Sequence, residues 1–528
     1  MLVLAVVLSE ASSPDKFAST GCDESVVVYV GRSDATFVTD AAIWNAASQA
    51  IPAVVAFAKN ATGVICAVNA ALKQNRNRKA KRFEREEAVM SISVRSGRHD
   101  YCGFSDNQDS LVVDVSNLTF INVLPSSGNS LPTAVDVGPG VRLFNLYDTL
   151  AKQGIVFYGG TCPTVAVGGF VLGGGFGAGS RLVGLGSDNL IEADIVTVDE
   201  NQQVILKTIR DTAMLKELNM RFPVDAEEAA ADLDLLWALR GGGSGNFGVV
   251  TRLRLRVYPL PSITSRLRID YHSRDATIQA LKLFETIAPA APDGLFSVFS
   301  LYTAASAVDF YYPGQSSDLK AASSAESFLS IPGAISIGVD ELPFIDAISK
   351  ISGCSDPSQC RNLAKNWFPD PLNSPLYFEA RSQYFNEPLT NSLAALNDLL
   401  DTFASAPKNL TVFLLFDAYG GKVNRVPPNA TAFPHRRTVH HGQTLVYFSE
   451  KTNPGSQLQA QEFLQTVSNI VLPVAGTPGA YRNYPNLLVD NANDRYFLFN
   501  LQKLEAVKLR VDSYNFFRYN QSITSSWS

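Results

Sequence analysis

Two residues whose side chains can act as nucleophiles stand in glycine-containing loops, 63 positions apart in the chain. His99 follows the apolar, strand-like run Met90–Val94 and the turn residue Gly97. Cys162 lies within Gly159–Gly169, a segment with glycines on both sides of it. Because glycine has no side chain, such loops let the backbone approach a flat or phosphorylated ligand closely. A histidine and a cysteine presented in this way can bond to one cofactor.

A second group of polar and aromatic residues lies in the C-terminal half. Asp417 precedes a Gly-Gly pair, and Tyr481 and Tyr484 are three positions apart. Oxidising an alcohol means moving a hydride while removing the hydroxyl proton, and a tyrosine with a pKa of about 10 is a poor base unless its surroundings change that pKa. A nearby carboxylate does not lower it by charge, but it can accept or align the phenol proton. The alternative is that both tyrosines are core aromatics and Asp417 is a turn residue.

Other patterns in the sequence resemble functional motifs but lack the spacing or the structural context that those motifs require. Gly243–Gly248 spells GxGxxG, but the dinucleotide fingerprint needs a strand before it and a helix after it, and here that order is reversed. This order favours a loop that passes over a cofactor's diphosphate. His435, His440 and His441 match no metal-binding spacing, so we interpret them as structural or surface residues and predict no metal site. The chain also has no GxSxG elbow and no P-loop.

The composition describes an ordered globular protein with more than one domain. A chain of 528 residues is too long for a single core. The net charge of −6 gives no reason to expect nucleic acid as a partner, and no apolar run reaches the ~18 residues of a membrane span. The basic stretch Lys73–Glu87 is interpreted as a solvated helix extension or an insertion loop, with a nucleic-acid or membrane patch as the alternative.

Several features predict a secreted, extracellular protein. Residues 1–20 begin with an apolar run that lacks a basic start, which is typical of a weak or truncated signal peptide, an ordinary apolar N-terminus being the alternative. Cys354 and Cys360 bracket a short, turn-prone segment that a disulfide can close. Five sequons permit glycosylation, at Asn60, Asn117, Asn409, Asn429 and Asn520.

Apolar spacing predicts alternating strands and helices up to about residue 261. Strands are expected over Ser25–Val30, Met90–Val94, Ser110–Val115, Asn189–Asp199 and Val249–Tyr258, and helices over Ile51–Leu72 and Val141–Gln153. Eleven of the 36 glycines fall between Gly159 and Gly186, which indicates backbone packed against a large group. Longer strands and helices after Pro261 suggest a second domain over residues 262–475.

Taken together, the motifs resemble the berberine-bridge-enzyme-like FAD-linked oxidases, and among them the carbohydrate (gluco-oligosaccharide) oxidases. The resemblance covers most of the chain and rests on Arg95–Tyr101, Cys162–Gly169, Gly173–Gly177, Gly184–Ile191, Gly245–Thr251 and Lys508–Ile523. It implies the α+β fold of the vanillyl-alcohol-oxidase superfamily. A PCMH-type FAD-binding domain is expected over residues 21–261, an α/β substrate domain with an antiparallel sheet over 262–475, and a tail, 476–528, that returns to the FAD-binding domain.

The resemblance further implies FAD held by two covalent links, with the 8α-methyl on His99 and C6 on Cys162. The family usually has two glycines before the histidine, whereas this chain has Gly97 and Arg98; Arg98 is expected to reach toward phosphate or solvent, or to alter the loop. A Cys22–Cys66 disulfide is also implied, which leaves Cys102 and Cys162 unpaired. The other cofactor contacts carried over are Arg95, Ser96, Val165, Val167, Gly168, Gly169, Gly174, Gly175, Gly177, Asp188, Gly248, Val249, Val250, Asn483 and Tyr484.

On the substrate side, the resemblance implies Tyr481 as base and Asp417 as its support, with Gln443 and Tyr101 near the substrate. The small Val165 favours an oxidase. The expected reaction oxidises a sugar's anomeric hydroxyl to a lactone while O₂ becomes H₂O₂. One alternative is an alkaloid or secondary-metabolite oxidase that performs alcohol oxidation or oxidative cyclisation. Another is a flavin-carrying binding or allergen-like protein with little catalysis. Two departures from the family's usual residues support this alternative: Arg98, and Asn486 in place of an acidic residue.

Overall fold

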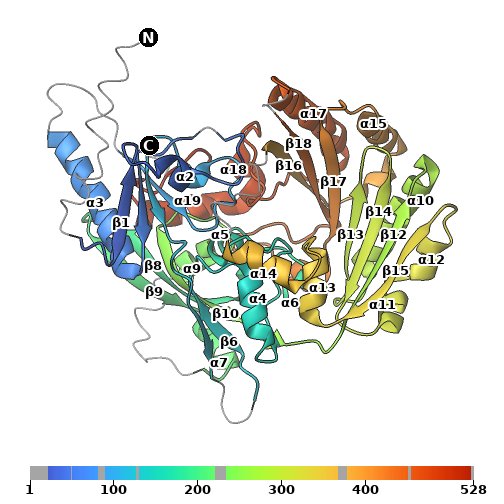
Figure 1. Ribbon diagram of the computed structural model, residues 1–528, viewed down its shortest axis with the longest axis horizontal. Helices are drawn as coiled ribbons and strands as arrows, with labels where there is room; N and C mark the ends of the chain where they lie inside the picture. Colours follow the sequence, from blue (N-terminus) through green and yellow to red (C-terminus); the bar gives the residue numbers. More distant parts are fainter. Residues whose placement is uncertain are drawn as a thin grey trace.

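The computed structural model describes residues 22–48, 50–80, 90–125, 130–220, 233–366, 377–449 and 453–524. Strands between residues 27 and 256 form one half of the molecule, and a separate seven-stranded sheet forms the other (Figure 1). The predicted α+β class, with an antiparallel sheet in the second half, is confirmed. The proposed signal segment 1–20 lies outside the described residues.

The first sheet has the order β1-β2-β4-β3. Strand β1 (Val27–Gly31) runs antiparallel to β2 (Val54–Ala58), and β4 (Leu111–Asp114) pairs in parallel with β2 and β3 (Ile92–Arg95). The expected helix over Ile51–Leu72 is wrong in its first part, because Val54–Ala58 is an interior strand and α3 (Ala61–Ala80) begins only after it. A buried strand reads as a continuous apolar run, which its sequence shares with a buried helix. The Asn60 side chain accepts a hydrogen bond from the Gly63 amide at 3.0 Å and marks the start of α3.

The second sheet is antiparallel throughout, with the order β5-β6-β10-β8-β9. Its strands are β5 (Ile121–Leu124), β6 (Ala134–Val137), β8 (Leu190–Val198), β9 (Val204–Arg210) and β10 (Val249–Arg256). Helices α4 (Leu143–Ala151), α5 (Val167–Leu172) and α9 (Leu233–Leu239) share a core with it. Because α9 precedes the GxGxxG segment and β10 follows it, the rejection of a dinucleotide fingerprint is confirmed.

The third sheet has the order β15-β12-β14-β13-β17-β18-β16. These strands are β12 (Thr264–Tyr271), β13 (Phe296–Leu301), β14 (Ser306–Tyr312), β15 (Ile335–Leu342), β16 (Tyr377–Phe385), β17 (Thr411–Ala418) and β18 (His440–Phe448). Helices α10 (Arg274–Ile287), α15 (Leu393–Ala404) and α17 (Ser456–Val471) pack on the face turned away from the first half (Figure 1). The opposite face is therefore free to meet the first half.

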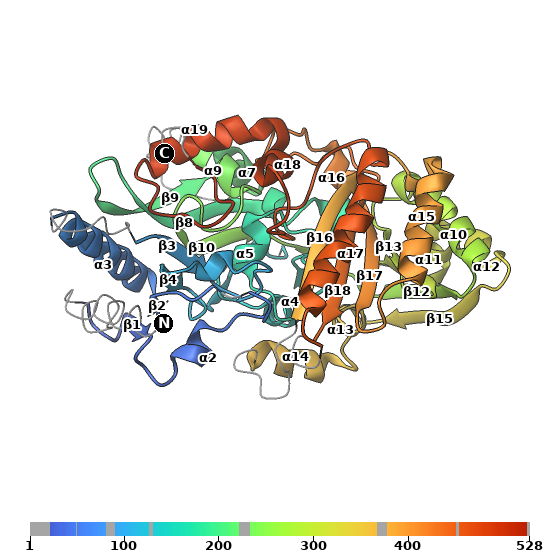
Figure 2. The ribbon, with the colours of Figure 1, turned by 90° about the horizontal axis from the view of Figure 1, so that it is seen from above.

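After the third sheet, the chain returns to the first half. Helices α18 (Ala492–Phe497) and α19 (Leu501–Val511) lie over it (Figure 2). The Ile92 amide of β3 donates to the Phe516 carbonyl at 2.8 Å, so the tail covers an edge strand of the first sheet. The buried Lys508 ammonium contacts Asp512 at 2.7 Å and the Phe517 carbonyl at 2.6 Å, which fixes the turn after α19.

Both expected disulfides are present, Cys22–Cys66 and Cys354–Cys360, while Cys102 and Cys162 are free thiols. Helix α3 continues through part of the basic stretch to Ala80, and residues 81–89 lie outside the described part of the chain. Among the helices that are described, none is both long enough and apolar enough to cross a membrane.

Candidate active site

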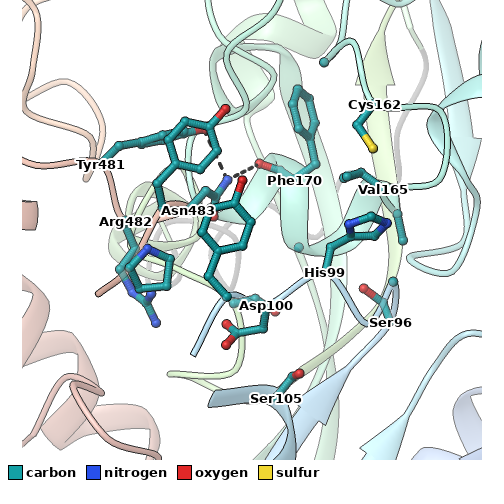
Figure 3. A pocket seen from close by; sticks show the side chains of 18 of the residues that line it. Ser96, His99, Asp100, Ser105, Cys162, Val165, Phe170, Tyr481, Arg482 and Asn483 are labelled. Carbon is teal, nitrogen blue, oxygen red and sulfur yellow. Dashed lines mark hydrogen bonds between the residues drawn. The ribbon is translucent and has the colours of Figure 1, made fainter. Parts of the chain in front are cut away.

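A cavity of about 260 Å³ lies where the two halves meet. The first half contributes Ser96–Tyr101, Gly160–Cys162 and Gly243–Ser244 to its wall. Phe296 and Asp417 come from the seven-stranded sheet, and Tyr481–Pro485 come from the segment that follows it. In Figure 3, His99 and Cys162 lie on one side of this cavity, and Tyr481 and Asn483 on the other.

The two candidate nucleophiles converge on one hydroxyl group. His99 Nε2 shares a hydrogen bond with Thr164 Oγ1 at 2.9 Å, and Cys162 Sγ lies 3.5 Å from the same oxygen. Burial, together with the positive charge of Arg142, holds the pKa of His99 well below its usual range. The imidazole is therefore neutral and keeps a lone pair for bonding. The two loops thus direct two reactive atoms to one place.

Arg142 fastens the histidine loop to the cysteine loop. Its Nη1 donates to the carbonyl oxygens of Gly97 and Thr164, at 2.9 Å each. Burial lowers the pKa of Arg142 to about 10, so the guanidinium remains charged at neutral pH. The loops are so close that a Cβ at Gly97 would lie 2.8 Å from the Ala166 amide nitrogen. Only glycine fits at position 97.

Arg95 and Arg98 support the histidine loop from behind. The Arg95 guanidinium is fully buried between Asp106 and Asp114, with Nε 2.7 Å from Asp114 Oδ2. Arg98 adopts φ +60°, the conformation that favours glycine, which is the family's usual residue at this position. Its side chain donates to the Thr39 and Ala42 carbonyls and lies 3.7 Å from Asp114. The expectation that Arg98 reaches toward solvent is therefore corrected: its guanidinium joins a buried ion-pair network, and Arg98 keeps the backbone shape of a glycine. Its contact with phosphate stays a prediction.

On the opposite wall, the hydroxyl oxygen of Tyr481 is surrounded by donors. The amides of Gly175 and Phe176 donate to it at 2.8 and 3.3 Å, and Asn483 Nδ2 donates at 3.2 Å. Burial raises the pKa of Tyr481 above its ordinary value, against the opposing effect of these hydrogen bonds. Gly174, at φ +125°, lets the loop lie directly against the ring, since a Cβ there would come 3.1 Å from it.

Tyr101 and Tyr484 form a stacked pair at the cavity, with ring centroids 5.5 Å apart and planes 4° from parallel. Gln443 Nε2 donates to the Tyr101 hydroxyl at 3.0 Å, although Gln443 itself does not line the cavity. Burial raises the pKa of both tyrosines, so both phenols are protonated at neutral pH. Within the described part of the chain, the Tyr484 hydroxyl has no hydrogen-bond partner.

Asp417 lines the cavity but makes no hydrogen bond to Tyr481; the contact is with a histidine. His441 Nδ1 lies 3.4 Å from Asp417 Oδ2. His441 is buried, with its ring 5.6 Å from that of Tyr481 and 5.5 Å from that of Tyr484. The interpretation of the three histidines as structural or surface residues therefore omits the position of His441 beside the site. His440 is paired with Glu285 at 2.6 Å, and His435 Nε2 donates to the Tyr496 carbonyl at 3.0 Å.

Most of the predicted site residues come together at this cavity, and some do not. Those that line it are Ser96, Gly97, Arg98, His99, Tyr101, Cys162, Val165, Gly169, Gly177, Asp417, Tyr481, Asn483 and Tyr484. Those that do not line it are Arg95, Val167, Gly168, Gly174, Gly175, Asp188, Gln443, Gly248, Val249 and Val250. The Asp188 carboxylate instead pairs with Arg436 at 2.6 Å and accepts from the Leu185 amide at 2.8 Å. Val249 and Val250 are buried in β10, where they pair with β8.

Some residues of the site could not be recognised from the sequence. Thr164 and Arg142 form hydrogen bonds that connect the two loops, and the ring centroid of Trp44 lies 4.8 Å from that of His99. Arg482 is buried and lines the cavity, and its Nε has no hydrogen-bond partner among the described residues. A charged guanidinium side chain on a cavity walled by aromatic rings suits a flat ligand with anionic groups. The residues present therefore fit FAD.

Comparison with known proteins agrees with this geometry. A family model described as "FAD binding domain" matches residues 82–205, and one described as "Berberine and berberine like" matches residues 480–524. Berberine bridge enzyme-like 12 of Arabidopsis thaliana is 29% identical over 462 residues, which cover 82% of this chain and 80% of that protein.

Solved structures show the same fold. The carbohydrate oxidase of Microdochium nivale superposes with a TM-score of 0.78 at 22% identity, covering 97% of this chain and 99% of that one. Glucooligosaccharide oxidase of Acremonium strictum, studied for its 6-S-cysteinyl, 8α-N1-histidyl FAD, superposes with a TM-score of 0.76 at 22% identity, covering 97% and 98%.

Proposed function

We propose, since the chain belongs to the berberine-bridge-enzyme-like FAD-linked oxidoreductases, that it oxidises the anomeric hydroxyl of a mono- or oligosaccharide to a lactone. The observation that carries this proposal is the convergence of His99 and Cys162 across one cavity from Asp417 and the tyrosines. The fold is shared with carbohydrate oxidases, which supports a sugar as the substrate class.

The first half would hold FAD through His99 and Cys162. Thr164 aligns both reactive atoms, and Arg142 keeps their loops at a fixed spacing. Arg482 and the Gly243–Ser244 loop line the same cavity and would bind the polar part of the cofactor. When bound, FAD supplies the hydride acceptor and passes the electrons on to O₂. The small Val165 on the cavity wall is consistent with access for O₂.

The second half would orient the sugar and take its proton. Tyr481 is the base expected from the sequence, and its three donors would stabilise a phenolate. The same donors occupy the oxygen that would have to accept the substrate's proton. Tyr484 is the second candidate for the base. It lines the cavity and its hydroxyl has no hydrogen-bond partner among the described residues, so the contacts favour Tyr484 over Tyr481. Tyr101, oriented by Gln443, and Asp417 offer polar groups to the sugar hydroxyls.

Secretion remains part of the proposal. The two disulfides suit an oxidising compartment. Four of the five sequon asparagines, namely Asn60, Asn117, Asn429 and Asn520, are exposed and accessible to glycosylation.

The cofactor part of the proposal is tested by intact mass and by flavin fluorescence on a denaturing gel. The wild type should keep one FAD after denaturation, each of His99→Ala and Cys162→Ala should keep a single link, and the double variant should release its flavin. Cys102→Ser is the matched control, because Cys102 is a free thiol that does not line the cavity. Release of flavin by the wild type would refute the covalent attachment.

The substrate part is tested by anaerobic reduction of the bound flavin with a panel of aldoses and oligosaccharides. Replacement of the base by phenylalanine should slow reduction by about 10²–10⁴-fold without loss of FAD. Comparing Tyr481→Phe with Tyr484→Phe identifies which tyrosine takes the proton. Reduction by alkaloids or aromatic alcohols but by no sugar would establish the secondary-metabolite alternative, and reduction by neither class would favour a flavin-carrying binding protein.

A further inference from the structure

One buried side chain beside the site has an unused hydrogen-bonding group. His441 is 1% exposed, and its Nδ1 contacts the Asp417 carboxylate at 3.4 Å. Its Nε2 has no hydrogen-bond partner among the described residues. Buried polar atoms normally have partners, so an unpartnered one in a native site requires an explanation.

The seven-stranded sheet determines which way this histidine points. In the register of the sheet, His441 on β18 lies between Asp417 on β17 and Tyr384 on β16. Since successive side chains of a strand point to opposite faces, His440 points the other way and pairs with Glu285 of α10. Two adjacent histidines thus have different surroundings. One lies in the hydrophobic core on the helix-covered face, and the other faces the cavity side.

The ring of His441 is enclosed by titratable groups from every element packed against it. Its ring centroid lies 4.9 Å from Tyr384 and 6.3 Å from Tyr419, in addition to its contacts with Tyr481 and Tyr484. Asp417 is the carboxylate in contact with it. Two other charged or titratable groups face this region: His435, whose burial lowers its pKa to about 3, and Arg436, which is paired with Asp188.

A tyrosine base in such surroundings needs help to ionise. Burial raises the pKa of Tyr481 and of Tyr484, and the Asp417 charge raises both further. A positive charge within about 6 Å has the opposite effect, because it favours the phenolate. A carboxylate in contact with an imidazole favours the charged ring, and Asp417 lies in this position, 3.4 Å from His441 Nδ1.

We propose that His441, held by Asp417, is a positioning residue that favours the phenolate form of the active-site tyrosine. This inference rests on the proposed alcohol oxidation. No hydrogen bond joins His441 to either tyrosine among the described residues, so a charged His441 ring acts through space, with its centroid 5.6 Å from that of Tyr481 and 5.5 Å from that of Tyr484. The phenolate takes the proton of the substrate hydroxyl as the hydride leaves, which forms the tyrosine O–H bond. The tyrosine then releases this proton to solvent, so the phenolate is restored for the next turnover.

The pH profile of flavin reduction tests this role in the holoenzyme. His441→Gln should slow reduction by about 100-fold at pH 7, and the difference from the wild type should become smaller as pH rises, because high pH ionises the tyrosine without help from His441. A merely structural defect would lower the rate equally at every pH. Asp417→Asn, which keeps the ring but removes its counter-charge, should change the profile in the same direction by a smaller factor. An unchanged profile shape in both variants would overturn the proposal.

A second measurement does not depend on activity. When the holoenzyme is titrated to higher pH, the ultraviolet tyrosinate band should appear at a higher pH in His441→Gln than in the wild type. His440→Gln is the matched control on the same strand: it should lower the melting temperature but leave the pH at which this band appears unchanged. FAD content and melting temperature are recorded for each variant, and Asp417→Asn serves if His441→Gln does not load FAD. If no sugar reduces the wild type, the proposed function fails, whereas a tyrosinate band that appears at the same pH in the wild type and in His441→Gln refutes the role of His441 alone.

Discussion

The two walls of the cavity are built by different means. On the His99–Cys162 wall, backbone carbonyls, glycines and a buried arginine network hold the loops. On the Asp417–Tyr481 wall, side chains from neighbouring strands and from the C-terminal segment contact one another. The first arrangement fixes position and tolerates little change, whereas the second places titratable groups close together. From this comparison we expect changes in the first wall to affect cofactor loading and stability, and changes in the second wall to affect rate, pH dependence and substrate choice.

The largest expected effect is at Arg95. Replacing it with methionine leaves Asp106 and Asp114 buried with only Arg98 nearby, so unfolding should become easier by about 3–5 kcal/mol. Thermal or urea denaturation measures this change. Arg32→Ala removes an exposed pair with Asp109 and should cost less than ~1 kcal/mol. Equal effects at the two sites would mean that the buried network does not support the first wall.

Next comes Arg142→Met, which removes two charge-assisted hydrogen bonds between the loops. The expected loss of stability is about 2–3 kcal/mol, and the fraction of covalently held flavin should fall because the loops are no longer at a fixed spacing. Intact mass and thermal denaturation report the two effects separately. Full covalent loading in this variant would show that the loops keep their spacing without Arg142.

The smallest of these effects concerns acid stability and the second wall. Burial lowers the pKa of His435 from 6.5 to about 3. Below pH 6.5 His435 binds a proton in the unfolded chain but stays neutral in the folded state. Its contribution to the free energy of unfolding is therefore fully present above pH 6.5 and decreases as pH falls toward about 3. Between pH 6.5 and pH 5 the loss should reach about 2 kcal/mol. His435→Gln should have a flatter melting-temperature profile across this range, and an equally steep profile would assign the acid sensitivity to other groups such as His99.

The sequence is informative where chemistry depends on one residue type in a local setting. His99 and Cys162 are identified by glycine-rich loops, and the structure brings them to a common hydroxyl. The strands predicted in the first half are also present, because alternating or continuous apolar runs reflect burial directly.

The sequence could not reveal the register of the strands or the contact partners of individual side chains. His440 and His441 are identical in type and adjacent, and only the pairing of β18 with β17 decides which of them meets Asp417. The Val54–Ala58 strand was misassigned because a run buried on both faces has no distinguishing period. Asp188 looked like a cofactor contact beside its glycines, but its partner, Arg436, is 248 residues away in the chain.

The return of the C-terminal tail has a consequence for biosynthesis. Tyr481–Pro485 and Tyr519 complete the cavity, and the Phe516 carbonyl and Phe517 pair with β3 just before His99. A ribosome therefore delivers the histidine and the cysteine hundreds of residues before the segments that enclose them. The cavity of the nascent chain is incomplete until residues 481–523 emerge, so the proposed attachment of the flavin would be completed only after translation.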